Sequence, residues 1–275
     1  ARNNLSGCSA AHDFGRNLLA SLPERSLYLG AGDFDLFPLW AMRAVEGEGE
    51  GVEAIGLGSF IDPKLAGVGG LERLKVRYGA RTVGPDLLRA MLTSPSGPPL
   101  MVAASGYDRR LHDLLPFIKV CRLTGIAGRL LKHWDAYGGA EATARVSRAY
   151  TYRGLRYAKG AGLFDLERLR DEVARGAMLI YPSSFATLGK LCMRFGLPGE
   201  AAWAFEKARD QMEALAGPLP PAPKASLWMP PDAAAAEEGC SAVIQGYHRL
   251  ADVYERRGVS LLAMQLRANA VALAR

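Results

Sequence analysis

The residue types best suited to chemistry stand together in one short segment, residues 30–35 (GAGDFD), directly after an apolar run. Its two glycines would let backbone N–H groups approach a ligand at a helix N-terminus, as in loops that bind nucleotides or methyl donors. Its two aspartates form an Asp-x-Asp pair, and two carboxylates at this spacing can hold a divalent cation together with a sugar-nucleotide diphosphate. The candidate ligand loop comprises Gly30, Gly32, Asp33, Asp35 and, further along, Trp40.

The same aspartates also have a structural interpretation, which we favour over both ligand interpretations. A helix is expected from Phe37 to Val45, entered at Pro38, and carboxylates just ahead of a helix stabilise its N-terminal dipole. Phe34 occupies the third glycine position of a dinucleotide loop, and no acidic residue clearly ends the following strand. The segment stays the candidate ligand site, with helix capping as its simpler role.

The remaining reactive side chains form no recognisable catalytic or metal-binding pattern. The four histidines and four cysteines lack the spacing of metal ligands, and the sequence contains no Gly-x-Ser-x-Gly nucleophile motif. We therefore predict no catalytic residue, no metal and no cofactor for this chain.

The charge of the 275-residue chain is unevenly distributed. The formal net charge is +6, but residues 1–63 carry 4 basic and 9 acidic side chains, whereas residues 64–170 carry 19 basic and 8 acidic ones. The basic block, which includes Arg153 and Arg156, can attract phosphates or an anionic membrane surface, or form a solvated face. No nucleic-acid-binding module is recognisable, so a nucleic-acid partner is not expected.

The first half alternates strand and helix signals. Short apolar strands are expected at 26–30, 52–57 and 100–104, helices at 71–78 and 86–92, and an edge strand at 117–123. This alternation predicts βαβ units and a small parallel sheet, which places ligands at the carboxyl ends of its strands. We assign residues 1–138 to an α/β, Rossmann-like domain.

The second half, residues 139–275, reads as helical and contains a repeat. Residues typical of the 34-residue tetratricopeptide template recur in it, with small residues that let paired helices approach and a Phe that fills the gap. An upstream helix is expected at 165–180, and a Pro-rich insertion at 214–240 separates the two copies. The first copy is carried by Phe185, Leu188, Gly189, Cys192, Ala201, Phe205 and Ala208, the weaker second by Tyr247, Leu250, Ala251, Tyr254, Ala263 and Ala270, with Arg267 suiting a terminal helix.

Two stretches of the first half resemble a known family. Residues 12–19 (HDFGRNLL) and 32–40 (GDFDLFPLW), followed by Glu46-Gly47, look like the region after the membrane spans in a family of bacterial multispan proteins of unknown function. That family is related to the GT-C class of protein O-mannosyltransferases. Residues 122–130 and 152–155 are also similar to it, so the resemblance spans about residues 3–210.

The resemblance implies a soluble domain on the periplasmic face of the bacterial inner membrane, tethered through membrane spans upstream. The chain opens Ala-Arg-Asn-Asn without a signal-peptide pattern and has no long apolar run, so we expect it to be soluble and cut from something longer. It would bind a polypeptide or glycan acceptor, or an accessory protein, rather than catalyse transfer.

The alternatives are a stand-alone tetratricopeptide interaction module or a soluble enzyme that uses residues 30–35 for a nucleotide or metal. Candidate binding residues are Arg153, Arg156, Trp203 and Tyr247, with Trp228 as a further exposed aromatic.

Overall fold

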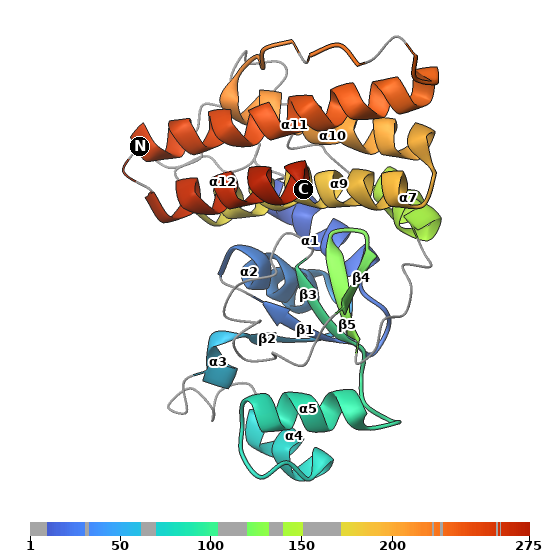
Figure 1. Ribbon diagram of the computed structural model, residues 1–275. Coiled ribbons are helices and arrows are strands. Elements are labelled where there is room, and N and C mark those ends of the chain that lie inside the picture. The colour runs from blue at the N-terminus through green and yellow to red at the C-terminus, as the bar shows by residue number, and fades with distance from the viewer. Residues whose placement is uncertain are drawn as a thin grey trace. The chain divides into compact units, whose positions relative to one another are not determined.

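The computed structural model describes residues 10–30, 33–61, 70–103, 120–131, 140–150, 172–221, 223–225, 228–256, 258 and 260–275 (Figure 1). Its contacts divide the chain into two compact units. One unit is α/β and comprises Ala11–Gly139 with Ala149–Thr151, and the other is helical and comprises Ala1–Ala10, Ala140–Arg148 and Tyr152–Arg275. The expected combination of an α/β part and an all-helical part is therefore present.

The α/β unit contains a five-stranded mixed sheet with the strand order β2-β1-β3-β5-β4. β1 pairs in parallel with β2 and β3, as the alternating pattern predicted. The expectation of a wholly parallel sheet is wrong, because β5 pairs antiparallel with both β3 and β4. β4 and β5 join through a tight hairpin, which needs no crossover helix. The strands are β1 Leu27–Gly30, β2 Glu53–Gly56, β3 Leu100–Ala103, β4 Val120–Thr124 and β5 Ala127–Leu131.

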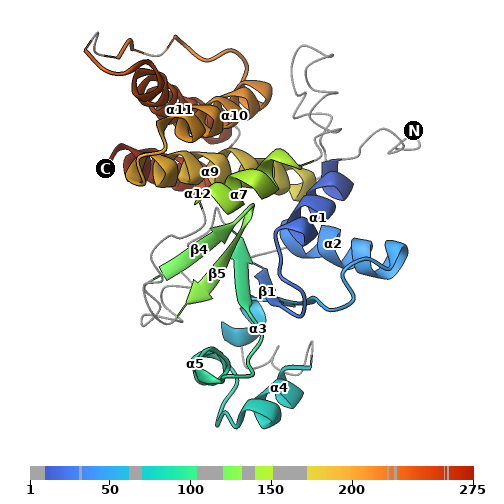
Figure 2. The same cartoon turned by 90° about the vertical axis from the view of Figure 1, so that its right-hand side faces the viewer.

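Helices lie on both faces of this sheet (Figures 1 and 2). Leu27 and Leu29 belong to a hydrophobic core that includes Leu71, Leu87 and other residues of α4 and α5, while the alternate strand position Tyr28 contacts α2. This division follows from the two-residue period of a strand. The helices of the unit are α1 Ala10–Ala20, α2 Asp33–Ala41, a π-helical turn η1 Met42–Glu46, α3 Gly58–Ile61, α4 Leu71–Tyr78 and α5 Pro85–Thr93.

Helix α2 begins earlier than its sequence suggests. The expected entry at Pro38 is wrong, because the helix begins at Asp33 and Pro38 lies inside it. Proline suits a first turn by itself, but here α1 packs against that part of α2: a Cβ added at Gly15 would lie 2.9 Å from the carbonyl oxygen of Pro38 and 2.8 Å from Met42 Cγ. The close approach of α1 thus accompanies a proline inside the helix, rather than at its first turn.

The β4–β5 turn is tied to the end of α1 by buried polar groups. The Thr124 hydroxyl donates to the Ser21 carbonyl oxygen at 2.8 Å, and the N–H of Ile126 contacts both Ser21 Oγ (3.2 Å) and Tyr150 Oη. Gly125 has a φ of +74°, and a Cβ there would collide with Tyr150 Oη and Ser21 Oγ. Only glycine therefore fits both the turn and its surroundings.

The helical unit is built from two pairs of successive helices. The helix α10 packs against α9 and α11, and α11 packs against α12. The helix expected at 165–180 is present from residue 172 as the start of α9, and residues 165–171 lie outside the described part. The insertion at 214–240 is only partly a loop, since its last ten residues belong to α11. The helices are α7 Ala140–Arg148, α9 Glu172–Arg194, α10 Pro198–Ala216, α11 Pro231–Arg256 and α12 Ser260–Ala274.

Candidate functional site

Close packing explains why residue 30 of the candidate loop is a glycine. Gly30 ends β1, and a Cβ built on it would collide with the side chain of Leu36 and lie 3.1 Å from Asp35 Oδ1. Gly32 lies outside the described residues, and Asp33 is described only as the first residue of α2. Gly30 thus permits close contact between β1 and α2, and its small size needs no ligand to account for it.

Asp35 is a buried residue of the first turn of α2, not part of an open loop. It has no exposed surface, and the phenol of Tyr28 donates a hydrogen bond of 2.9 Å to its Oδ2. Burial, and after it the neighbouring carboxylate, raises the pKa of Tyr28 well above its usual value of 10.0. Its burial and its contact with Tyr28 assign Asp35 a packing role within the α/β unit and do not support its prediction as a metal or nucleotide ligand.

The segments that carry the family resemblance meet on the outer face of α1. His12 Nε2 lies 2.5 Å from Glu46 Oε1, and Arg16 reaches Glu46 at 3.1 Å and Glu48 at 3.3 Å. Gly47 ends the π-helical turn in the left-handed conformation (φ +69°), and its N–H bonds to the carbonyl of Met42. Residues of the short motifs at 12–19 and 46–47 therefore form ion pairs that link α1 to η1.

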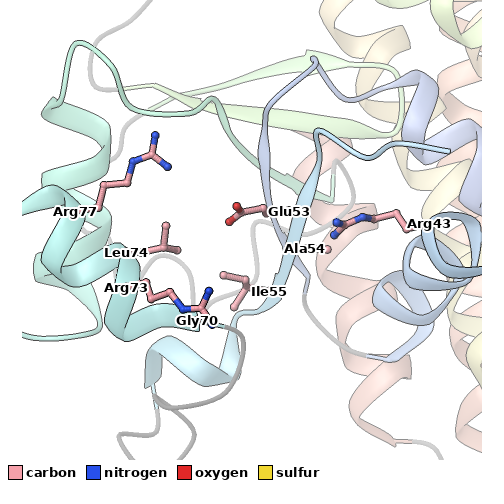
Figure 3. A pocket seen from close by; sticks show the side chains of 8 residues that line it. All are labelled: Arg43, Glu53, Ala54, Ile55, Gly70, Arg73, Leu74 and Arg77. Carbon is pink, nitrogen blue, oxygen red and sulfur yellow. The ribbon is translucent and has the colours of Figure 1, made fainter. Parts of the chain in front are cut away.

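A pocket of about 310 Å³ opens at the free edge of β2, the outermost strand of the sheet. Figure 3 shows Arg73 and Arg77 on the α4 side, Arg43 of η1 on the opposite side, and the residues of β2 between them. Ile55 and Leu74 are buried, whereas Arg73, Arg77 and Glu53 are exposed and Arg43 is partly so. The lining residues are Arg43, Glu53, Ala54, Ile55, Gly70, Arg73, Leu74 and Arg77.

Among the described members of the predicted ligand loop, Trp40 is the one whose side chain contacts a residue of this pocket. Its indole N–H donates to the carbonyl of Ala54, which lines the pocket, at 3.3 Å. Its ring lies 5.7 Å from that of Phe37, and these two aromatic side chains are 41% and 47% exposed. An exposed aromatic pair therefore stands beside a basic pocket.

Sequence reasoning missed the arginines of this pocket. Arg73 and Arg77 are four residues apart on the predicted helix 71–78, which places them on one face. That spacing and the basic block were the available signals. Arg43 joins them only because α2 and η1 bring it to the edge of β2.

The predicted binding residues of the helical unit are partly engaged in internal contacts. The Arg148 guanidinium lies 4.7 Å from the ring centroid of Trp203, the Phe185 ring packs edge-on against that indole at 5.7 Å, and Arg148 pairs with Glu200 at 2.7 Å. Trp203 is only partly exposed, whereas Trp228 is 94% exposed. Arg153 and Arg156 lie outside the described residues.

Tyr247 does not belong to a binding surface. Its side chain is 3% exposed, and burial raises its pKa to about 12, although a hydrogen bond with Ser183 opposes the shift. The expectation that Tyr247 forms part of a glycan surface is wrong, because α11 turns this residue into the helical core, at the position where the repeat template also places a packed residue.

Comparisons with protein-family models, curated proteins and solved structures find no match to this chain. Across the described helices, none is long and apolar enough to cross a bilayer.

Proposed function

We propose that this chain is a non-catalytic binding part of a GT-C-like membrane glycosyltransferase, tethered at the periplasmic face of the inner membrane. In this proposal its helical unit, a tetratricopeptide-like pair of helix hairpins, binds an acceptor polypeptide and presents it for glycosylation. A glycan acceptor and an accessory protein are the alternative partners. The sequence resemblance motivates the membrane context, and the packing of the helical unit supports the binding role.

The observation that carries the proposal is the contact between the two key positions of the first repeat. A Cβ built on Gly189 of α9 would lie 2.6 Å from the Phe205 ring of α10, and Phe205 and Ala201 have no exposed surface. A small residue facing a large aromatic across a helix pair is the arrangement that the repeat template specifies. Such helix pairs commonly form extended surfaces for partners.

The second hairpin supports the same interpretation as a terminal repeat. Ala251, Ala263 and Ala270 are buried between α11 and α12, as in the template. Arg267, which replaces an interior residue, instead pairs at the surface with Glu255 (2.5 Å) and Asp252 (3.1 Å). The hydrogen bond from Arg267, and after it the charge of Arg267, lowers the pKa of Glu255. A polar outer face is what the last helix of a repeat array requires.

Exposed apolar side chains on α9 and α12 indicate where a polypeptide would bind. Met193 is 39% exposed on α9, and Met264 and Val271 are 64% and 49% exposed on α12. The two helices lie side by side, since the Lys190 ammonium of α9 donates to the Ala272 carbonyl of α12. Exposed apolar side chains on two adjacent helices are a feature that surfaces for peptides share.

The test uses the full-length protein in its own cells, with glycosylation of envelope proteins followed by lectin blotting. We expect Met193→Glu with Val271→Glu to reduce glycosylation, because charges on this face would disfavour an apolar partner. His248→Glu, at an exposed polar position of α11, is the matched control and should leave glycosylation unchanged. Normal glycosylation in the double variant would contradict the proposed role, and so would an upstream reading frame without apolar spans of roughly 20 residues.

A further inference from the structure

We propose that the pocket at the edge of β2 binds a hydroxyl-bearing phosphate monoester, the chemistry of a sugar phosphate. The site lies wholly within the α/β unit, whereas the proposed acceptor surface lies in the helical unit. Neither proposal depends on the other, and their tests can fail independently.

The charge of the pocket favours a doubly negative ligand. Three guanidinium groups, those of Arg43, Arg73 and Arg77, face it together with the single carboxylate of Glu53. Throughout the described residues, none of the three arginines has an ion-pair partner, although Arg77 lies 5.6 Å from the ring centroid of Tyr78. Guanidinium groups bind phosphate through paired hydrogen bonds, so this lining suits a phosphate dianion.

The backbone of β2 adds a donor to the same wall. The N–H groups of Glu53 and Leu57 donate to the carbonyls of Ser26 and Gly30, on the side of β1. Peptide groups alternate in direction along a strand, so the N–H of Ala54 is directed to the free edge, where the pocket opens. A phosphate oxygen at this edge would meet a backbone donor as well as the guanidinium groups.

An added peptide strand fits this edge less well than a small anion. The outward carbonyl of Ala54, which an incoming strand would need as an acceptor, already accepts the indole N–H of Trp40. β2 also spans only Glu53–Gly56, which is short for strand addition. The N–H of Ala54 remains available to an anion while its carbonyl is covered.

The rest of the pocket suits the sugar portion of such a ligand. Its volume of about 310 Å³ lies at the small end of ligand pockets. The exposed carboxylate of Glu53 can accept hydrogen bonds from hydroxyl groups, and it would repel a bare phosphate. Ile55 and Leu74 provide a buried apolar floor against which the C–H groups of a sugar can pack. The lining thus offers partners to the hydroxyl and C–H groups of a sugar phosphate, which inorganic phosphate lacks.

The proposal is tested by calorimetric titration of the 275-residue chain with glucose 1-phosphate at low salt, near pH 7, where the phosphate is largely dianionic. We expect saturable binding that the double variant Arg73→Ala/Arg77→Ala weakens by about 10-fold or more, since each arginine supplies charge-assisted bonds. Arg81→Ala removes the same charge from a residue outside the pocket and should bind like the wild type. Glu53→Gln should strengthen binding of inorganic phosphate but not of glucose 1-phosphate.

A second arm distinguishes a soluble ligand from a lipid headgroup. Vesicles containing phosphatidic acid present a phosphate monoester, and vesicles containing phosphatidylglycerol present a diester of lower charge. Arginine-dependent, saturable binding of glucose 1-phosphate supports the proposal. Arginine-dependent binding to phosphatidic acid vesicles alone, whose headgroup carries no hydroxyl group, would identify a lipid phosphate instead and overturn the hydroxyl-bearing ligand. No saturable binding of glucose 1-phosphate, or full binding by the double arginine variant, would also overturn the proposal.

Discussion

The substitution Gly189→Ala tests whether α9 and α10 pack as closely as the structure indicates. A Cβ at residue 189 would lie 2.6, 2.7 and 2.8 Å from three atoms of the Phe205 ring. The side chain is closely enclosed, because Phe205 is fully buried and α11 also approaches it: a Cβ at Gly239 would lie 2.8 Å from Phe205 Cβ. One methyl group therefore forces the helix pair apart.

The expected magnitude is the difference between two opposing effects. Overpacking a closed core costs about 1–3 kcal/mol, and three contacts shorter than 3.0 Å place this site in the upper half of that range, at about 2–3 kcal/mol. Replacing a helical glycine by alanine gains about 1 kcal/mol from lower backbone entropy in the unfolded chain. We expect a net loss of about 1–2 kcal/mol, which moves the urea midpoint down by about 0.5–1 M for a typical dependence on denaturant.

The assay is urea unfolding followed by far-ultraviolet circular dichroism and by tryptophan fluorescence. The matched control is Gly199→Ala in α10, where the nearest atom to an added Cβ is Asp232 Oδ2 at 3.8 Å, and this variant should be slightly stabilised. In a Phe205→Leu background, Gly189→Ala should also become neutral or stabilising, because the smaller side chain makes room for the methyl group. A midpoint for Gly189→Ala at or above that of the wild type, in the native background, would refute the close packing.

Two further predictions concern buried titratable groups. Tyr28→Phe removes the donor to buried Asp35 and should destabilise the α/β unit by about 1–3 kcal/mol at neutral pH in urea unfolding. Because the folded-state pKa of Tyr28 is raised above 10.0, the stability it contributes is present below that pH and is lost as pH rises toward its folded pKa. The wild type should therefore lose stability above about pH 10 more steeply than Tyr28→Phe, and equal pH dependence would contradict the buried contact. Cys192 has no exposed surface, and burial raises its pKa to about 11, so it should resist alkylation in the native protein and react after unfolding, as peptide mass spectrometry would show. Rapid native labelling of Cys192 would contradict this packing.

The sequence by itself determined the elements whose local pattern agrees with their place in the fold. The apolar runs at 26–30, 52–57 and 100–104 became β1, β2 and β3, because short buried strands need little more than continuous apolar residues and flanking turns. The predicted helix 71–78 coincides with α4, whose ends carry glycines in the left-handed conformation. The close contact between Gly189 and Phe205 was also predicted from the sequence, as a small residue facing an aromatic one across a helix pair.

Only the tertiary structure decided which residues meet. The sheet is mixed because β5 pairs antiparallel with β3 and β4. The pairing of β5 with β3 joins residues far apart in the sequence, so no local sequence pattern predicts it. Asp35 changed from a candidate metal ligand to a buried partner of Tyr28 because α2 begins at Asp33 and packs on the sheet. The basic pocket draws on η1, β2 and α4, so its arginines come together only when the chain folds around the edge of β2. A sequence records the period of each element, but the distance between charges on different elements depends on how those elements pack.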